Sequence, residues 1–367
     1  MTIFDGFEWG ICIDDMWTYA GALPPKSIVI PHVLSMKLPQ GPFSMNFGKE
    51  LPRRSNLSTI SFTESSVGQK KELVRMFTRN LAKHLRENKV RFVRCWFQWN
   101  LFQPRILKAK QEYHFPLDHF VNTMNASGIE IIGVIGNGYY RFLPLGLNIN
   151  KLDHYLARLS DASREIVRHH KGKIAMWQLE NEPDWWLEHF ASDWRKGGIW
   201  FEKNVADTIL GKLHTIVREE DPGTPTMVNL EADTARAFVH SYSKYCEVLG
   251  LDFYPNYTNS GNINLSKLRE RVAEAKRLSG LPVMIAETGY PSGPRIFGFD
   301  QRKQADYVRA VCEEAYSIDS LRSLGMWRLS DPYWLSFPFQ ENSFGLIDRR
   351  GIPKKAWFEY VNQVSSK

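Results

Sequence analysis

The stretch Ile174–Leu179, IAMWQL, is apolar apart from one glutamine, and Glu180-Asn181-Glu182-Pro183 follows it at once. A short apolar run of this kind is typical of a strand buried on both faces of a parallel sheet. Seven similar runs are spread along the chain, so we predict eight strands. They are Phe7–Ile13, Val90–Trp96, Ile129–Ile135, Ile174–Leu179, Thr226–Leu230, Val248–Tyr254, Pro282–Ala286 and Ser323–Arg328.

Amphipathic segments separate these runs and indicate helices. Leu117, Phe120 and Met124 recur at helical spacing, for example, and Asn264 is in place to cap a later helix. Alternating strands and helices predict a parallel sheet, and eight such units favour a closed (β/α)8 TIM barrel of the α/β class over an open doubly wound sheet. The sequence has no glycine-rich GxGxxG after the first run and no P-loop, which counts against the open nucleotide-binding folds.

We expect residues 1–367 to form one catalytic barrel domain. The segment 14–66 does not follow the alternation, and its prolines and aromatic residues predict a long ordered excursion after the first strand.

The composition is that of a folded globular protein, with 43% apolar and 24% charged residues. The net charge of +7 permits binding to a polyanion, but the basic pairs are dispersed, so we expect no nucleic-acid partner. No apolar run is long enough to span a membrane, and the acidic N-terminus is unlike a secretory signal. We therefore expect a cytoplasmic protein, or a secreted one from which a signal has been removed. The four scattered cysteines suggest free thiols, which agrees with a reducing compartment.

Two predicted strands deliver a carboxylate at their carboxyl end, where barrel enzymes carry their active sites. The fourth run leads to Glu182, and the seventh leads to Glu287 in Glu287-Thr-Gly-Tyr-Pro291. Strands four and seven lie across the barrel mouth from each other, so the two carboxyls can flank one bond. Glycoside hydrolysis needs such a pair, one to protonate the leaving oxygen and one to act at the anomeric carbon.

Asn181-Glu182-Pro183 after strand four, together with a glutamate after strand seven, resembles clan A of the retaining glycoside hydrolases. The spacing of Arg94, Trp99 and Pro104 is similar to the second-strand signature of family one β-glucosidases, and the closing stretch Phe344–Ala356 resembles the end of many clan members. Glu287-Thr-Gly-Tyr-Pro291 resembles plant-type β-1,3-glucanases and β-1,4-galactanases. The resemblance is specific for the clan and does not single out a family.

Carried over position by position, the resemblance implies a role for each matching residue. Glu182 would be the acid/base and Glu287 the nucleophile, while Asn181 would hold the sugar 2-hydroxyl. The resemblance also implies that Arg94 and Tyr254 bind Glu287 and that Trp327 forms the floor of the sugar subsite. Trp185, after the acid/base, would be an outer platform for sugar or would pack under its loop.

Electrostatics agree with these roles. Arg94 and Tyr254 should lower the pKa of Glu287, whereas the charge of Glu287 should raise the pKa of Glu182. We expect the two carboxyls to lie about 5–5.5 Å apart, as retaining enzymes require.

No cofactor is expected. No metal is expected either, because neighbouring residues such as His169 and His170 usually point apart and so rarely bind one ion together. The predicted substrate is a β-linked oligo- or polysaccharide of glucan, mannan or galactan type, cut by double displacement. Three alternatives stay open: a transglycosylase using the same carboxylates, a non-catalytic carbohydrate-binding barrel, and a polyanion-binding barrel. The sequence does not decide between exo and endo action, and it gives no oligomeric state.

Overall fold

The computed structural model describes most of the chain. The described residues are 6–13, 64–103, 114–136, 144, 147, 152–184, 203–332, 339–349 and 351–367.

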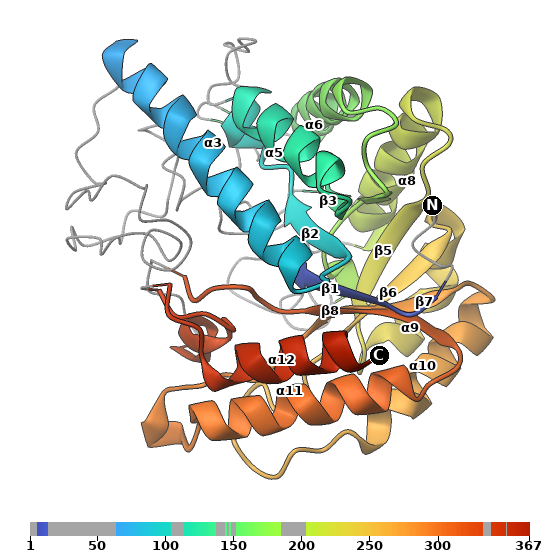
Figure 1. The fold of residues 1–367 in the computed structure, drawn as a ribbon. Coiled ribbons are helices and arrows are strands. Elements are labelled where there is room, and N and C mark those ends of the chain that lie inside the picture. The colour runs from blue at the N-terminus through green and yellow to red at the C-terminus, as the bar shows by residue number, and fades with distance from the viewer. Residues whose placement is uncertain are drawn as a thin grey trace.

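Eight parallel strands close into a barrel in chain order, with β1 paired to both β2 and β8 (Figure 1). The predicted (β/α)8 barrel is therefore confirmed, and each predicted strand is present within a few residues. The strands are β1 (Glu8–Cys12), β2 (Phe92–Trp96), β3 (Glu130–Val134), β4 (Met176–Gln178), β5 (Thr226–Glu231), β6 (Val248–Phe253), β7 (Val283–Thr288) and β8 (Leu321–Met326).

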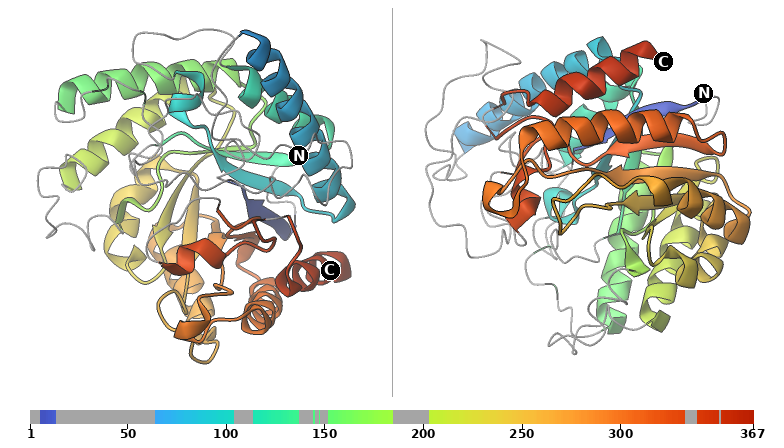
Figure 2. Two further views of the ribbon diagram at one scale, coloured as in Figure 1. Left: turned by 90° about the vertical axis from the view of Figure 1, so that its left-hand side faces the viewer. Right: turned by 90° about the horizontal axis from the view of Figure 1, so that it is seen from below.

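Helices surround the barrel, as the two rotated views show (Figure 2). The α-helices are α3 (Glu64–Glu87), α4 (Trp99–Phe102), α5 (Phe115–Ala126), α6 (Leu152–His169), α8 (Lys203–Glu220), α9 (Ala235–Tyr242), α10 (Ser266–Ser279), α11 (Gln301–Tyr316) and α12 (Lys355–Ser366). Short 3₁₀ helices are η3 (Ser243–Tyr245), η4 (Arg295–Phe297) and η5 (Phe339–Ser343). Within the described ranges, no helix is long and apolar enough to cross a membrane.

Two sequence expectations need correction here. The excursion was expected to continue to residue 66, but α3 already begins at Glu64, and the rest of that segment up to residue 63 lies outside the described residues. Asn264 is not the N-cap of α10, which is Leu265. The Asn264 side chain instead accepts a hydrogen bond from the backbone N–H of Ser266 at 3.2 Å, and Asn264 therefore stands one residue before the N-cap position.

Side chains alternate between the inside of the barrel and the surrounding helices. The outward residues of the strands join the helices in one large apolar core. The inward residues near the amino ends form a separate apolar layer of Phe92, Ile132, Met176, Met227, Val248, Met284 and Ala286. Above it, Arg94, Gln178, Asn229 and Asp252 lie beside the apolar Trp96 and Val134, so the base of the barrel is apolar and polar groups gather towards its carboxyl end.

The last helix returns to the first strand. Helices α11 and α12 lie side by side next to β1 and β8 (Figures 1 and 2). The Tyr360 hydroxyl on α12 donates to the carbonyl of Gly10 in β1 at 2.8 Å. The two ends of the barrel sequence are thereby joined by side-chain packing as well as by the sheet.

Candidate active site

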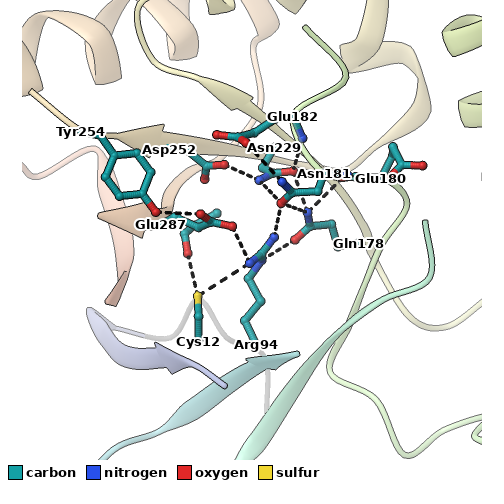
Figure 3. Close-up of polar contacts among 11 residues, drawn as sticks. Cys12, Arg94, Gln178, Glu180, Asn181, Glu182, Asn229, Asp252, Tyr254 and Glu287 are labelled. Atoms are coloured by element: carbon teal, nitrogen blue, oxygen red, sulfur yellow. Dashed lines mark hydrogen bonds and ion pairs between the residues drawn. The ribbon is translucent and has the colours of Figure 1, made fainter. Parts of the chain in front are cut away.

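Three carboxyl groups meet at the carboxyl ends of the strands (Figure 3). Glu182 follows β4, Asp252 lies near the end of β6, and Glu287 lies near the end of β7. One carboxylate oxygen from each lies within 4.8 Å of the other two. The nearest oxygens of Glu182 and Glu287 therefore lie closer together than the roughly 6.5–9.5 Å that separates the carboxyls of inverting enzymes, which favours the retaining spacing of about 5–5.5 Å.

Glu287 owes its position to an irregularity in the sheet. Ile285 packs outside the barrel and Ala286 inside, so simple alternation would turn Glu287 outwards. The register between β6 and β7 shifts after Leu251, and Asp252 pairs with Glu287. Such bulges re-aim side chains next to active sites, and this one brings Glu287 to the inside.

Each oxygen of Glu287 has its own donor. Arg94 Nη1 donates to Oε1 at 2.7 Å, and the Tyr254 hydroxyl donates to Oε2 at 2.7 Å. Burial raises the pKa of Glu287, while Arg94 and Tyr254 oppose that rise. The two donors thus act in the predicted direction, but the expected net lowering of the pKa is wrong, because the desolvation of a buried carboxylate outweighs them.

Arg94 is the centre of a wider network. It is 0% exposed, and besides Glu287 it donates from Nε to Gln178 at 2.6 Å and from Nη2 to Asn181 at 2.5 Å. Nη1 also lies 3.7 Å from the sulfur of Cys12. Three nitrogens of one guanidinium therefore hold side chains from β4, from the segment after it and from β7 in fixed positions.

The amide of Asn181 has a determined orientation. Its Oδ1 accepts from Arg94 and from Asn229 Nδ2, the latter at 2.9 Å. Its Nδ2 is then left to donate to Glu182 Oε2 at 3.3 Å. The Nδ2 side of this amide therefore faces Glu182, the acid/base candidate. A residue predicted to bind a sugar hydroxyl needs a donor on that side.

The backbone at Glu182 is unusual. Its φ is +43°, in the left-handed region that residues other than glycine rarely adopt. The N–H of Glu182 donates to Asn229 Oδ1 at 3.2 Å, which helps to hold this conformation. Glu180 lies apart from the three carboxyls in Figure 3, and its Oε1 accepts from the N–H of Asn181 at 2.9 Å.

Trp327 lies beside the site in a buried cluster with Cys12, Trp96, Val134 and Phe344, and is 6% exposed. Its ring stands edge-on to Trp96 with centroids 6.4 Å apart. Its predicted role as the floor of a sugar subsite stays a prediction. Trp185, the predicted outer platform, lies outside the described residues.

Sequence reasoning missed three polar residues of the site, namely Gln178, Asn229 and Asp252. Each stands inside an apolar run, two positions after an inward-facing residue of its own strand: Met176, Met227 and Gly250 respectively. The signal was therefore present as a break in the inward pattern. Asn229 connects the site, since it contacts Gln178, Asn181, Glu182 and Asp252.

The three carboxyls are also close enough together to attract a cation. Both oxygens of Glu287, however, already have donors, and Arg94 supplies a positive charge. The arrangement instead offers a fixed carboxylate on one side and a second carboxyl opposite it, which suits displacement at a carbon between them.

Comparisons with known proteins agree with the predicted resemblance. No family model matches the chain. The chain is 25% identical over 224 residues to endo-1,4-beta-xylanase B from Thermotoga neapolitana, a match that covers 57% of this chain and 62% of that enzyme. The chain thus spans less than two thirds of the length of this relative.

Among solved structures, the β-glycosidase BGL167 superposes with a TM-score of 0.67 at 14% identity, covering 98% of this chain and 96% of that one. A GH5_18 variant from Streptomyces cattleya, in complex with Manb1-4GlcNAc, gives a TM-score of 0.64 at 15% identity, covering 80% and 75%. At these identities the structural likeness concerns the fold. The relatives are glycoside hydrolases of clan A, and no single family is distinguished.

Proposed function

We propose that the chain is a retaining glycoside hydrolase that cleaves β-linked glycosidic bonds, with Glu287 as nucleophile and Glu182 as acid/base. The observation that carries the proposal is the pair of carboxylate oxygens within 4.8 Å of each other across the barrel mouth. The donors on both oxygens of Glu287 support its part as the ionised member. No cofactor is required.

The reaction would proceed by double displacement. Glu287 attacks the anomeric carbon while Glu182 gives its proton to the leaving oxygen, so that the glycosidic bond breaks and a glycosyl ester forms. Water then attacks the same carbon and gives a proton to Glu182, the ester bond breaks, and Glu287 is ionised again. Asn181 Nδ2 is placed to bind the sugar 2-hydroxyl, a contact that strengthens in the transition state.

The site and the relatives both support the proposed substrate class. Trp327 and Trp96 form a buried aromatic cluster beside the carboxyls, and an aromatic ring next to the reacting groups suits the apolar face of a sugar ring. The curated relative is named as a 1,4-β-xylanase, and the solved GH5_18 variant holds Manb1-4GlcNAc. We therefore propose a β-linked oligo- or polysaccharide of glucan, mannan, galactan or xylan type.

The test is hydrolysis of a panel of aryl β-glycosides and soluble β-glycans, with the configuration of the first product followed by ¹H NMR. Wild type should turn over at least one substrate and release the β-anomer. Glu182→Ala and Glu287→Ala should each lose at least 10³-fold in kcat on a natural glycan, while Glu270→Gln, on the exposed face of α10, serves as the control.

Two outcomes would contradict the proposal. An inverted first product would exclude double displacement, and turnover that survives Glu287→Ala would exclude that residue as nucleophile. Hydrolysis and transfer to a second sugar share the same first step, so product analysis at high substrate concentration separates them. A barrel that only binds sugar would show no turnover on any substrate.

A further inference from the structure

Asp252 is a third carboxyl in the site, and it has no role in the double displacement described above. It is 0% exposed, and one of its oxygens lies within 4.8 Å of an oxygen of Glu182 and of Glu287. A fully buried carboxylate is costly unless a positive charge or several donors compensate it. What compensates Asp252 therefore has to be found among its neighbours.

The charged and titratable groups that face this carboxyl come from four elements. Arg94 on β2 is the only cation among the described groups at the site, and its Nη1 is bonded to Glu287 on β7. Glu182, after β4, adds negative charge, and Tyr254, after β6, already donates to Glu287. One cation thus faces three carboxyls, so ionisation of all three would leave net negative charge in a buried site.

The hydrogen bonds of Asp252 also indicate that this carboxyl is not ionised. Asn229 Nδ2 donates to Oδ2 at 2.5 Å, but Oδ1 is buried and has no donor among the residues that the structure describes. A proton on Asp252 removes the charge and turns this oxygen into a donor, and the neighbouring acceptor is Glu182. Burial, followed by the charges of Glu287 and Glu182, raises the pKa of Asp252 well above its usual range.

We propose that Asp252 is protonated at neutral pH and donates its hydrogen bond to Glu182, acting as a positioning residue for the acid/base. Its part in catalysis rests on the proposed function. When Glu182 has given its proton to the leaving oxygen, the O–H of Asp252 faces the new carboxylate and stabilises it. When Glu182 takes a proton from water, the same hydrogen bond remains and Asp252 keeps its own proton throughout.

The protonation can be tested without any substrate. If Asp252 holds a proton in the folded state and releases it on unfolding, the protein loses stability as the pH rises. The folding equilibrium constant then falls by up to tenfold for each unit of pH increase, between the ordinary pKa of an aspartate and its raised value. Urea denaturation at pH 5, 6 and 7 should show this slope in wild type. Asp252→Asn should flatten it, and Glu270→Gln, which removes an exposed carboxyl, should keep it. An unchanged slope in Asp252→Asn would overturn the proposal.

The role beside Glu182 is tested by comparing two variants on a substrate that wild type cleaves. Asparagine keeps a neutral donor, so Asp252→Asn should retain kcat within about tenfold, whereas Asp252→Ala should lose about 10²-fold. Equal losses in both variants would overturn the donor role. If wild type cleaves nothing, the proposed function fails, but the denaturation experiment still decides whether Asp252 is protonated.

A second, independent inference concerns the helical layer. Asp118 on α5 meets two consecutive histidines, His169 at the end of α6 and His170 after it. Oδ1 of Asp118 lies 2.6 Å from Nε2 of His169 and 3.8 Å from Nε2 of His170. The expectation that neighbouring histidines point apart is therefore wrong here, because the chain turns at the end of α6.

His170 provides the second observation. It is 0% exposed, and neither ring nitrogen has a hydrogen-bond partner among the described residues, while Nε2 faces Asp118. Two ligands of a tetrahedral zinc ion lie about 3.4 Å apart, given bonds of about 2.0–2.1 Å. The two distances from Asp118 Oδ1, 2.6 Å and 3.8 Å, lie on either side of that value. Asp118 and His169 are each more than a third exposed, so an ion can enter from solvent.

We infer that Asp118, His169 and His170 form a binding site for a divalent transition metal such as Zn²⁺, apart from the active site. Calorimetric titration of the full chain with ZnCl₂ should show one site, with a matching rise in Tm. His169→Ala and Asp118→Asn, both at partly exposed positions, should weaken binding at least tenfold, and His240→Ala, at an exposed histidine on α9, should leave it unchanged. The absence of binding, or binding that survives both site variants, would overturn the inference.

Discussion

At the scale of single residues, the two oxygens of Glu287 are held by donors of different kinds. Arg94 brings a charge and also fixes two other side chains, whereas Tyr254 brings a neutral hydroxyl and contacts Glu287 alone among the acceptors described here. Removing each donor should therefore have a different effect on the enzyme. Loss of the Tyr254 hydroxyl should mainly change the pKa of Glu287. Loss of the Arg94 guanidinium should also release Gln178 and Asn181 from their positions.

Tyr254→Phe should lower kcat by about 10- to 100-fold, because a hydrogen bond to a charged group contributes a free energy that corresponds to a factor of this size. The hydroxyl lowers the pKa of Glu287, so its loss lets that pKa rise further. As the proposed nucleophile, Glu287 must be ionised to attack, so the acidic limb of the kcat/KM profile should move to higher pH. A pH–rate series measures both effects, with the exposed Tyr316→Phe as control. An acidic limb at the same pH in Tyr254→Phe and wild type would contradict the proposed effect of this hydroxyl on Glu287.

Arg94→Lys should lower kcat/KM by at least 10²-fold although the charge is kept. Lysine has one nitrogen in place of the three that now reach Gln178, Asn181 and Glu287, so it cannot hold all three. Circular dichroism should show a folded barrel, and steady-state kinetics should show the loss. Activity close to wild type would mean that charge alone is sufficient at this position.

At the scale of the elements, two residues other than glycine adopt a left-handed backbone among those that the structure describes, and they differ in purpose. Glu182, with φ +43°, stands in the site, while Lys89, with φ +57°, stands in the turn between α3 and β2. The turn is held by backbone bonds such as that from Val90 N to Leu85 O at 3.0 Å. The strained backbone at Glu182 positions the proposed acid/base, whereas the strained backbone at Lys89 positions no group of the candidate site.

Lys89→Gly should therefore stabilise the fold by about 0.5–1 kcal/mol, because glycine adopts this conformation without a steric penalty. Chemical denaturation measures the gain, and activity should not change. Lys83→Gly, within α3, is the opposite control and should cost about 1 kcal/mol. A loss of stability in Lys89→Gly would show that its side chain contributes more than the strain costs.

The sequence predicted the strands well because all eight are apolar runs between helical patterns. Helix α9 was not predicted, although its buried Ala235, Phe238, Val239 and Tyr242 follow the helical spacing i, i+3, i+4, i+7, because this pattern covers only eight residues. The place of Glu287 after strand seven suggests that it faces the site, but the inward turn of its side chain could not be predicted from alternation. That turn depends on a shift in register between two strands, and such a shift leaves no mark in either strand alone.

At the scale of the whole molecule, the barrel has no free edge, so its interior has a fixed size. Gly10 of β1 faces Phe92 of β2, and an added methyl group would overlap the Phe92 ring. Phe92 is itself 0% exposed within the basal apolar layer and cannot move aside without disturbing the other strands. A small change in one strand is therefore transmitted around the barrel.

Gly10→Ala should destabilise the fold by about 1–3 kcal/mol through overpacking. Gly6→Ala is the matched control, since nothing lies within 4 Å of the methyl group it would add. Urea denaturation of the two variants beside wild type measures the difference. Equal stability of both variants would mean that the ring of Phe92 can relocate after all.

The four buried cysteines have a practical consequence for following the motions of this barrel. Cys12 ends β1 beneath Arg94, Cys95 lies in β2, Cys246 precedes β6 and Cys312 lies in α11, and all four are thiols rather than halves of a disulfide. Burial raises the pKa of Cys246 to about 12, so its thiol stays protonated and unreactive in the folded state. A thiol-labelling reagent must therefore wait for local opening at each position. Labelling of Cys12 would time the opening of the mouth, and a sugar bound above it should slow that reaction without a mutation or an added probe.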